Sequence, residues 1–420
     1  MLPRPMPLRL GPRPLPLHLA VEAWITQLSF AALTFSSAGL RNSKLPLPIL
    51  PPLGLPALDL LSRALRESHP DADAAQLDPV QLVNAVAVAA KARIEGFVRG
   101  VARYQDAPIP NRPTPPAPVW TQGAASLRFY GGTKTPVLVV PSLVNRATVL
   151  DLSPDRSFLR ALAQEDIATY LLDWGTPGPE ELTYDVGAYI ARVLLPALHA
   201  VAMRERAPVH LAGYCLGGTL SMAPAVLAPS HVAGLILLAA PWDFHADNAP
   251  SRAMMTNMRP LLEMMLAANN GAPVDLLQAL FASLDPSLVG RKFRAFADLA
   301  PASEEAKRFV ALEDWLNDGV PLSAGVARQC LFEWYGANAP LLKQWRVGDT
   351  VIDPAKVAVP ALVMIPSQDR IVPPRSAAAL ADALPNAEAI QVPLGHIGMM
   401  AGGGAPKVTF APVVRWLQNR

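Results

Sequence analysis

The stretch from residue 210 to residue 220, "HLAGYCLGGTL", carries the strongest pattern in this chain. The apolar run before Cys215 predicts a buried strand and the residues after it predict a helix, so the cysteine falls on a sharp strand-to-helix turn. Such a turn needs small neighbours, here Gly213, Gly217 and Gly218. The pattern places a thiol at a helix N-terminus, where the thiolate and a developing oxyanion are both favoured.

Short apolar runs alternate with helical patterns along the chain after residue 118. Alternation of this kind is typical of a parallel sheet covered by helices on both faces. The runs lie at residues 136–141, 168–174, 209–214, 234–241, 361–366 and 388–393. Together with the turn at Cys215, they predict an α/β-hydrolase fold, a mostly parallel sheet with a helical cap insertion and a Pro-rich helical N-terminal region.

Four segments follow from this pattern. We expect a Pro-rich helical N-terminal region at 1–118, a first core segment at 119–242, a helical cap without strands at 243–353 and a second core segment at 354–420. Within the N-terminal region we expect an amphipathic helix at residues 17–40, because His18, Glu22 and Gln27 disfavour a membrane-spanning one, and two helices between residues 58 and 104.

Two further residues complete a catalytic constellation with Cys215. Asp369, in "IPSQDRIVPP", and His396, in "VPLGHIGMM", each follow a predicted strand directly, in the chain order nucleophile, acid, histidine. We predict that His396 takes the proton of Cys215 and that Asp369 orients His396. His245 is the rival histidine and Asp243 the next candidate for the acid.

Backbone amides are the expected oxyanion donors. The N–H of Leu216 is the first, and the second is expected from the loop after the strand at 136–141, where Leu143 and Val144 are the candidates and Val144 is chosen. The second cysteine, Cys330, is expected to be a buried residue of the cap.

The composition excludes several classes of protein. A formal net charge of +2 argues against a nucleic-acid binder. Two cysteines without a Cys-x-x-Cys pattern predict no metal site and no disulfide scaffold, and the N-terminus lacks the apolar core of a secretory signal. We therefore expect a cytoplasmic protein that needs no cofactor.

With these residues in view, the chain resembles a polyhydroxyalkanoate synthase catalytic subunit from about Val137 onward. The similarity lies in "DLSPDRS", "LLDWG", "GYCLGGTL", "PWDF", "EDWLNDGVP", "SQDRIVPP" and "GHIGMM", in the family's order. The short chain is more similar to the two-subunit type. The resemblance implies Cys215 as the acyl-carrying nucleophile, His396 as the base and Asp369 as its partner, a 3-hydroxyacyl-CoA substrate and a growing polyester.

The resemblance also implies partners. These are a second synthase subunit or a second copy of the chain, and the surface of a polyester granule. A thiol suits this chemistry because exchange between thioesters keeps the acyl group reactive for transfer. Two other functions stay open: a cysteine-dependent thioesterase or intracellular polyhydroxyalkanoate depolymerase on the same fold, and a non-catalytic granule-associated paralogue.

Overall fold

The structure is a computed structural model that describes residues 9–39, 79–247 and 249–420. The chain divides into two compact units, one drawn from residues 1–110 and 278–317 and the other from residues 111–277 and 318–420. Residues 278–317, which the sequence analysis placed in the cap, therefore share a unit with the N-terminal helices. The larger unit contains the sheet and all the candidate site residues.

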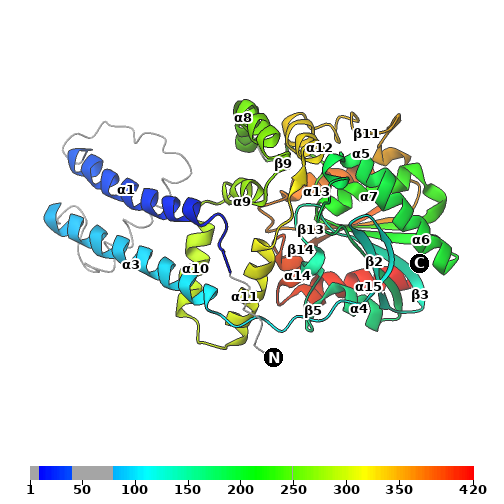
Figure 1. Ribbon diagram of the computed structural model, residues 1–420, viewed down its shortest axis with the longest axis horizontal. Helices are drawn as coiled ribbons and strands as arrows, with labels where there is room; N and C mark the ends of the chain where they lie inside the picture. Colours follow the sequence, from blue (N-terminus) through cyan, green and yellow to red (C-terminus); the bar gives the residue numbers. More distant parts are fainter. Residues whose placement is uncertain (1–8, 40–78, 248) are drawn as a thin grey trace. The chain divides into compact units, whose positions relative to one another are not determined.

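An eight-stranded sheet forms the centre of the larger unit (Figure 1). Its order is β1-β2-β6-β3-β7-β8-β13-β14. The pairs β1–β2 and β2–β6 are antiparallel and every later pair is parallel. The strands are β1 (Pro118–Gln122), β2 (Ala125–Gly131), β3 (Lys134–Val140), β6 (Ile167–Asp173), β7 (Val209–Tyr214), β8 (Val232–Leu238), β13 (Ala361–Pro366) and β14 (Ala387–Val392).

All six predicted strands are confirmed within a few residues. Two strands that were not predicted, β1 and β2, form an antiparallel hairpin at one edge of the sheet. Their residues are largely part-exposed or exposed, so they lack the continuous apolar run that identified the inner strands.

Helices cover both faces of the sheet. The His210 ring on β7 meets Trp416 of α15 (Ala411–Gln418) at 5.9 Å between ring centroids. Gly213, three positions later on the same strand, packs against α7 (Leu216–Leu227). Because successive side chains of a strand point to opposite faces, α15 and α7 lie on opposite sides of the sheet. The other helices of this core are α4 (Phe158–Gln164), α5 (Val186–Tyr189), α6 (Leu195–Glu205), α13 (Pro374–Ala383) and α14 (Gly398–Ala401).

One helical stretch of the described residues, Val186–Glu205, is apolar and long enough to span a membrane by length and composition alone. It comprises α5, a π-helical turn at Ile190–Leu194 and α6, and it packs against β3 and β7. Its apolar side chains are therefore those of a helix that covers a sheet.

The segment between β8 and β13 is mainly helical, as predicted. It contains α8 (Ala249–Ala268), α9 (Val274–Ala282), α10 (Leu288–Asp298), α11 (Glu304–Asn317), α12 (Ala324–Arg328) and a π-helix, η6 (Gln329–Gly336). The expectation that this segment has no strands is wrong. Two short ladders join Gly271–Ala272 to Leu322–Ser323 and Arg346–Val347 to Thr350–Val351, and such two-residue strands have no periodicity to detect.

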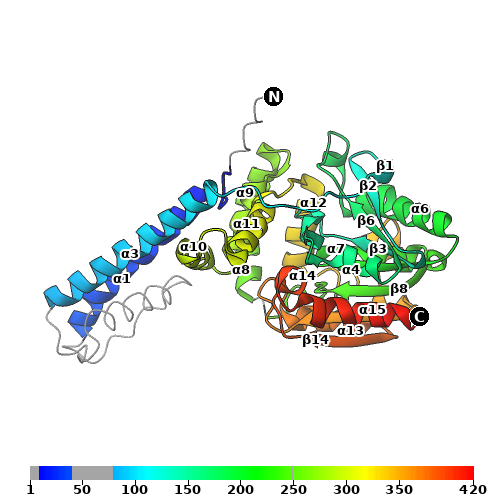
Figure 2. The ribbon, with the colours of Figure 1, turned by 90° about the horizontal axis from the view of Figure 1, so that it is seen from below.

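The smaller unit is helical. Its helices are α1 (Leu15–Gly39), α3 (Pro79–Gln105), α10 and α11, and α1 and α3 lie side by side (Figures 1 and 2). The predicted helix at residues 17–40 is confirmed by α1, and α3 is one of the two expected between residues 58 and 104. The other lies outside the described residues.

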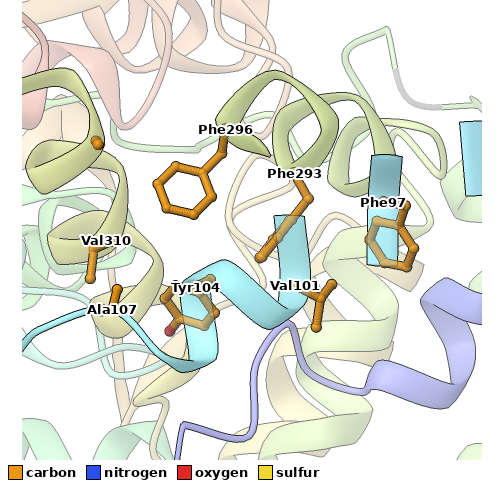
Figure 3. Close-up of a cluster of buried hydrophobic side chains, with 8 residues drawn as sticks. Phe97, Val101, Tyr104, Ala107, Phe293, Phe296 and Val310 are labelled. Atoms are coloured by element: carbon orange, nitrogen blue, oxygen red, sulfur yellow. The ribbon is translucent and has the colours of Figure 1, made fainter. Parts of the chain in front are cut away.

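Apolar side chains from three helices, with aromatic rings from α3 and α10, form a core cluster of this unit (Figure 3). Phe97 and Tyr104 of α3 meet the fully buried Phe293 of α10 edge to face, at 6.1 and 5.6 Å between centroids. Glu22 of α1 is also buried, and it pairs with Arg93 at 2.6 Å and with Arg294 at 2.9 Å. A buried carboxylate needs such partners, which explains an acidic residue in an apolar helix.

Candidate active site

Cys215 occupies a strained turn between β7 and α7. Its backbone has φ +54° and ψ −128°, a conformation that non-glycine residues rarely adopt and that marks functional sites when the surroundings enforce it. The turn is enforced by two hydrogen bonds: the Cys215 N–H donates to the Leu238 carbonyl at 2.8 Å, and the Cys215 carbonyl accepts from Gly218 N–H at 2.9 Å. The side chain stays partly exposed at the N-terminus of α7.

The three glycines around Cys215 are required by close packing of the backbone. A Cβ on Gly213 would lie 2.4 Å from the Gly218 Cα, and one on Gly217 would lie 2.0 Å from the Val140 carbonyl oxygen at the end of β3. A Cβ on Gly218 would lie 2.4 Å from the Cβ of Ala240. No real Cβ atom approaches neighbours so closely, so the turn closes only with glycine at these positions.

Asp369 and His396 form a buried pair. The Nδ1 and Oδ2 atoms lie 2.7 Å apart, and both residues are 7% exposed. The other carboxylate oxygen of Asp369 accepts hydrogen bonds from the N–H groups of Ile371 and Val372 at 2.8 and 2.9 Å. The carboxylate is therefore fixed in orientation, with one oxygen held by the backbone and the other aimed at the imidazole.

The structure brings this pair to Cys215. Burial by itself lowers the pKa of the His396 imidazole, but the negative charge of Cys215 and the hydrogen bonds with Asp369 and Cys215 outweigh burial and raise that pKa from 6.5 to about 10. The raised pKa favours the protonated form of the His396 imidazole. The three residues come from the ends of β7, β13 and β14, which share one edge of the sheet because these strands are parallel.

The candidate oxyanion donors are backbone N–H groups of Leu216 and of the loop after β3. Leu216 is the first residue of α7, where amides have no acceptor within the helix. The loop after β3 lies next to it because β3 pairs with β7. In that loop the Val144 N–H donates to the Ser142 hydroxyl at 3.2 Å, whereas the Leu143 N–H has no hydrogen bond within the described part of the chain.

The rival residues have other partners. The Nε2 of His245 lies 3.1 Å from the Tyr335 carbonyl oxygen and 3.2 Å from that of Gly336. Asp243 accepts from the His245 N–H at 2.9 Å and from the Asn338 side chain at 2.8 Å. These contacts hold the loop after β8 to the end of η6, so neither side chain is paired with His396.

Cys330 lies on η6 and is partly exposed rather than fully buried, which departs from the sequence expectation. Burial, followed by the negative charges of Glu333 and Cys215, raises the pKa of its thiol to about 12. Cys330 is therefore a neutral thiol near the site and a poor nucleophile at neutral pH.

Two aromatic residues that were not predicted as site residues, Tyr214 and Trp174, support the site. Tyr214 donates its hydroxyl to the His396 carbonyl at 3.0 Å, and its ring lies 5.2 Å from the imidazole. Trp174, in "LLDWG", donates its indole N–H to the Pro141 carbonyl at 3.0 Å, at the start of the loop that carries Leu143 and Val144. Both residues fall inside quoted motifs, but an aromatic residue in a motif does not by itself reveal what it supports.

The described residues contain no group of three or more His, Cys, Asp or Glu side chains that could hold a metal ion. The groups that the structure brings together at the site are a thiol, an imidazole and a carboxylate, next to the first backbone amides of α7.

Comparison with known proteins shows the family of the chain. The family profile for the alpha/beta hydrolase fold matches residues 136–402, and the chain belongs to that fold. The chain is 30% identical over 294 residues to the poly(3-hydroxyalkanoate) polymerase subunit PhaC of Allochromatium vinosum, covering 68% of this chain and 81% of that protein. The corresponding protein of Synechocystis sp. is 29% identical over 294 residues, covering 68% and 78%. Within the alpha/beta hydrolase fold, the chain belongs to the poly(3-hydroxyalkanoate) polymerase PhaC family.

Among solved structures, the monoacylglycerol lipase of Paleococcus ferrophilus matches 71% of this chain and 99% of its own, at 14% identity and a TM-score of 0.44.

Proposed function

We propose that this protein polymerises 3-hydroxyacyl groups from CoA thioesters into a polyester, through an acyl group carried on Cys215. One observation carries the proposal: in a chain of the PhaC family, the left-handed turn at Cys215 presents a thiol beside a buried imidazole that is oriented by a carboxylate. A serine in this position would give an ester, whereas a cysteine gives a thioester that stays activated for transfer.

The first step is acylation of Cys215. The thiolate attacks the thioester carbonyl carbon, and the resulting oxyanion is bound by the Leu216 N–H and by a second N–H from Leu143 or Val144. When the carbon–sulfur bond to CoA breaks, the His396 imidazolium gives its proton to the departing sulfur. CoA leaves as a thiol, and the products are acyl-Cys215 and a neutral imidazole.

The second step is chain transfer. The hydroxyl of a second hydroxyacyl unit loses its proton to the neutral His396 and attacks the acyl-Cys215 carbonyl. An ester bond forms, the bond to the Cys215 sulfur breaks, and the sulfur leaves as a thiolate. The imidazolium and thiolate are thereby restored, and Asp369 stabilises the imidazolium throughout.

The proton balance depends on the Nδ1 contact with Asp369. With Nδ1–H donated to the carboxylate, the Nε2 atom of the neutral imidazole is a free acceptor that can face the incoming hydroxyl. Water could be deprotonated in the same way, so polymer growth requires that water reach acyl-Cys215 more slowly than the growing chain does. The helices of the larger unit between β8 and β13, which are α8, α12 and η6, are the candidates for this exclusion.

The remaining expectations belong to the same proposal. The protein acts in the cytoplasm without a cofactor, CoA being only the leaving group. Its partners are a second synthase subunit or a second copy of the chain, and the surface of a polyester granule.

The test is product analysis with 3-hydroxybutyryl-CoA. Wild-type protein should release CoA thiol and form insoluble polymer, and intact-mass analysis should show an acyl adduct on Cys215. Cys215→Ala should abolish CoA release, while Cys330→Ala, which removes the other thiol, should keep the adduct on Cys215.

Two results would contradict the proposal. Wild-type rates of CoA release in Cys215→Ala would exclude the thiol as nucleophile. Free 3-hydroxybutyrate in place of polymer would identify a thioesterase or depolymerase.

A further inference from the structure

Tyr335 carries a phenol that the proposed mechanism does not use. It lies near the end of the π-helix η6, and π-helical turns within proteins are often found at functional sites. Its side chain is partly exposed, and its hydroxyl has no hydrogen-bond partner within residues 9–39, 79–247 and 249–420. A donor that is left without a partner at an accessible position is available to a ligand.

The topology of the sheet places Tyr335 beside the nucleophile. Its ring meets Phe244 edge to face at 5.0 Å between centroids. Phe244 belongs to the loop after β8, and β8 lies between β7, which ends at Cys215, and β13, which leads to Asp369. The loop starts next to the nucleophile, because the Cys215 N–H donates to Leu238 at the end of β8.

Hydrogen bonds join the end of η6 to the loop after β8. The imidazole of His245 lies 3.1 Å from the Tyr335 carbonyl oxygen, and the Asn338 side chain accepts from the Phe244 N–H at 2.9 Å. The amide group of Asn338 donates in turn to Asp243 at 2.8 Å. Tyr335 is thus held in place by its backbone and its ring, while its hydroxyl is free to bind.

The charges around Tyr335 agree with this position. Burial raises the pKa of the phenol, and the negative charges of Cys215 and Asp369 raise it further. The hydroxyl therefore keeps its proton at neutral pH and can act as a hydrogen-bond donor beside the reacting sulfur.

The side of Cys215 on which Tyr335 lies identifies the group that it meets. In the proposed acylation step the thioester oxygen is bound by Leu216 and by the loop after β3, the strand that pairs with β7 on one side. Tyr335 comes from the opposite side, with the loops after β8 and β13. On that side of a bound 3-hydroxyacyl group, away from the carbonyl oxygen, the polar atom is the 3-oxygen.

We propose that Tyr335 is a specificity-determining residue that donates a hydrogen bond to the 3-hydroxyl of the acyl group at Cys215. The inference rests on the proposed function. It explains how the site distinguishes a 3-hydroxyacyl-CoA from an acyl-CoA without the hydroxyl, and it orients the same hydroxyl for the next transfer.

The test measures binding, so that it does not depend on turnover. In the Cys215→Ala background, calorimetry compares the Kd of 3-hydroxybutyryl-CoA with that of butyryl-CoA, which lacks the 3-hydroxyl. We expect the hydroxylated ester to bind about 3- to 10-fold more tightly, the range for one hydrogen bond. Adding Tyr335→Phe, which keeps the ring contact with Phe244, should remove this preference and leave butyryl-CoA binding unchanged.

A matched variant controls for the loss of a phenol elsewhere. Tyr170 lies on β6, and its hydroxyl donates a hydrogen bond to Glu205. Tyr170→Phe removes that hydroxyl and should keep the preference for the 3-hydroxyl. An unchanged preference in Tyr335→Phe, equal weakening of both esters, or no binding of either ester would overturn the inference. Loss of preference in Tyr335→Phe would support it even if the wild-type protein released free acid, a result that contradicts only the proposed function.

Discussion

Replacement of Asp369 by asparagine should inactivate the site by changing the tautomer of His396. In the wild-type protein one Asp369 oxygen accepts from the N–H groups of Ile371 and Val372, and the other accepts from His396 Nδ1. In Asp369→Asn the amide oxygen must stay with the two backbone donors, because turning the amide would place its NH₂ group against them. The NH₂ group then faces Nδ1, and only an imidazole protonated at Nε2 can accept from it.

An imidazole with its proton on Nε2 cannot act as the base toward the hydroxyl. The corresponding change in a Ser-His-Asp triad lowers kcat roughly 10⁴-fold, and we expect a loss of roughly 10³- to 10⁴-fold here, about 4 to 5.5 kcal/mol in the barrier. The fold should survive, because the side-chain volume and the backbone hydrogen bonds are kept. A loss of about 1 kcal/mol in unfolding free energy would lower the Tm by only a few degrees.

The assay is stopped-flow detection of CoA thiol from 3-hydroxybutyryl-CoA, together with a thermal melt. Asp353→Asn is the matched control, since Asp353 also caps a turn by accepting from the N–H two residues later, at 3.1 Å, but it lies before the N-terminal end of β13. Asp353→Asn should keep the wild-type kcat. A folded Asp369→Asn variant with a kcat within tenfold of the wild type would refute the reasoning and show that another group orients His396.

Two other predictions concern packing and pH. Gly217→Ala should lower the free energy of unfolding by about 1 to 3 kcal/mol and should also slow CoA release, because its Cβ would lie 2.0 Å from the Val140 carbonyl oxygen and displace the loop after β3. The control is Gly403→Ala, whose Cβ would meet only Arg156 at 3.9 Å. Denaturant melts and rate assays should show no change in that variant. The raised pKa of His396, about 10 against 6.5, stabilises the folded protein fully below pH 6.5, and this stabilisation is lost as the pH rises toward 10. Urea titrations across this range should show that loss in the wild type and a smaller one in Cys215→Ala, which lacks the thiolate charge; equal pH dependence of the two proteins would contradict the pairing.

The core of the fold could be predicted from the sequence because buried parallel strands leave a strong local pattern. The run before Cys215 and the other five apolar runs all appear as strands of one sheet. The antiparallel pair β1 and β2 and the two-residue ladders could not be predicted, because half-exposed or very short strands lack a continuous apolar run.

Chain order and local sequence by themselves determined the fold class and the three residues of the candidate site. Cys215, Asp369 and His396 each follow a strand, and parallel strands deliver their following loops to one edge of a sheet. Only the tertiary structure decided how these residues meet, because the distances depend on the strand order, in which β7, β8, β13 and β14 are neighbours although long segments separate them in the chain.

The same physical reason explains why Tyr214, Trp174 and Tyr335 were missed. Each contacts a residue that is distant in the sequence. Tyr214 donates a hydrogen bond to His396, Trp174 donates one to Pro141, and the ring of Tyr335 packs against Phe244. The left-handed turn at Cys215 likewise depends on closure of the backbone, and the raised pKa of His396 depends on Cys215 and Asp369, whose effect outweighs that of burial. The sequence shows which residues can do the chemistry, and the packing of distant segments sets their protonation and orientation.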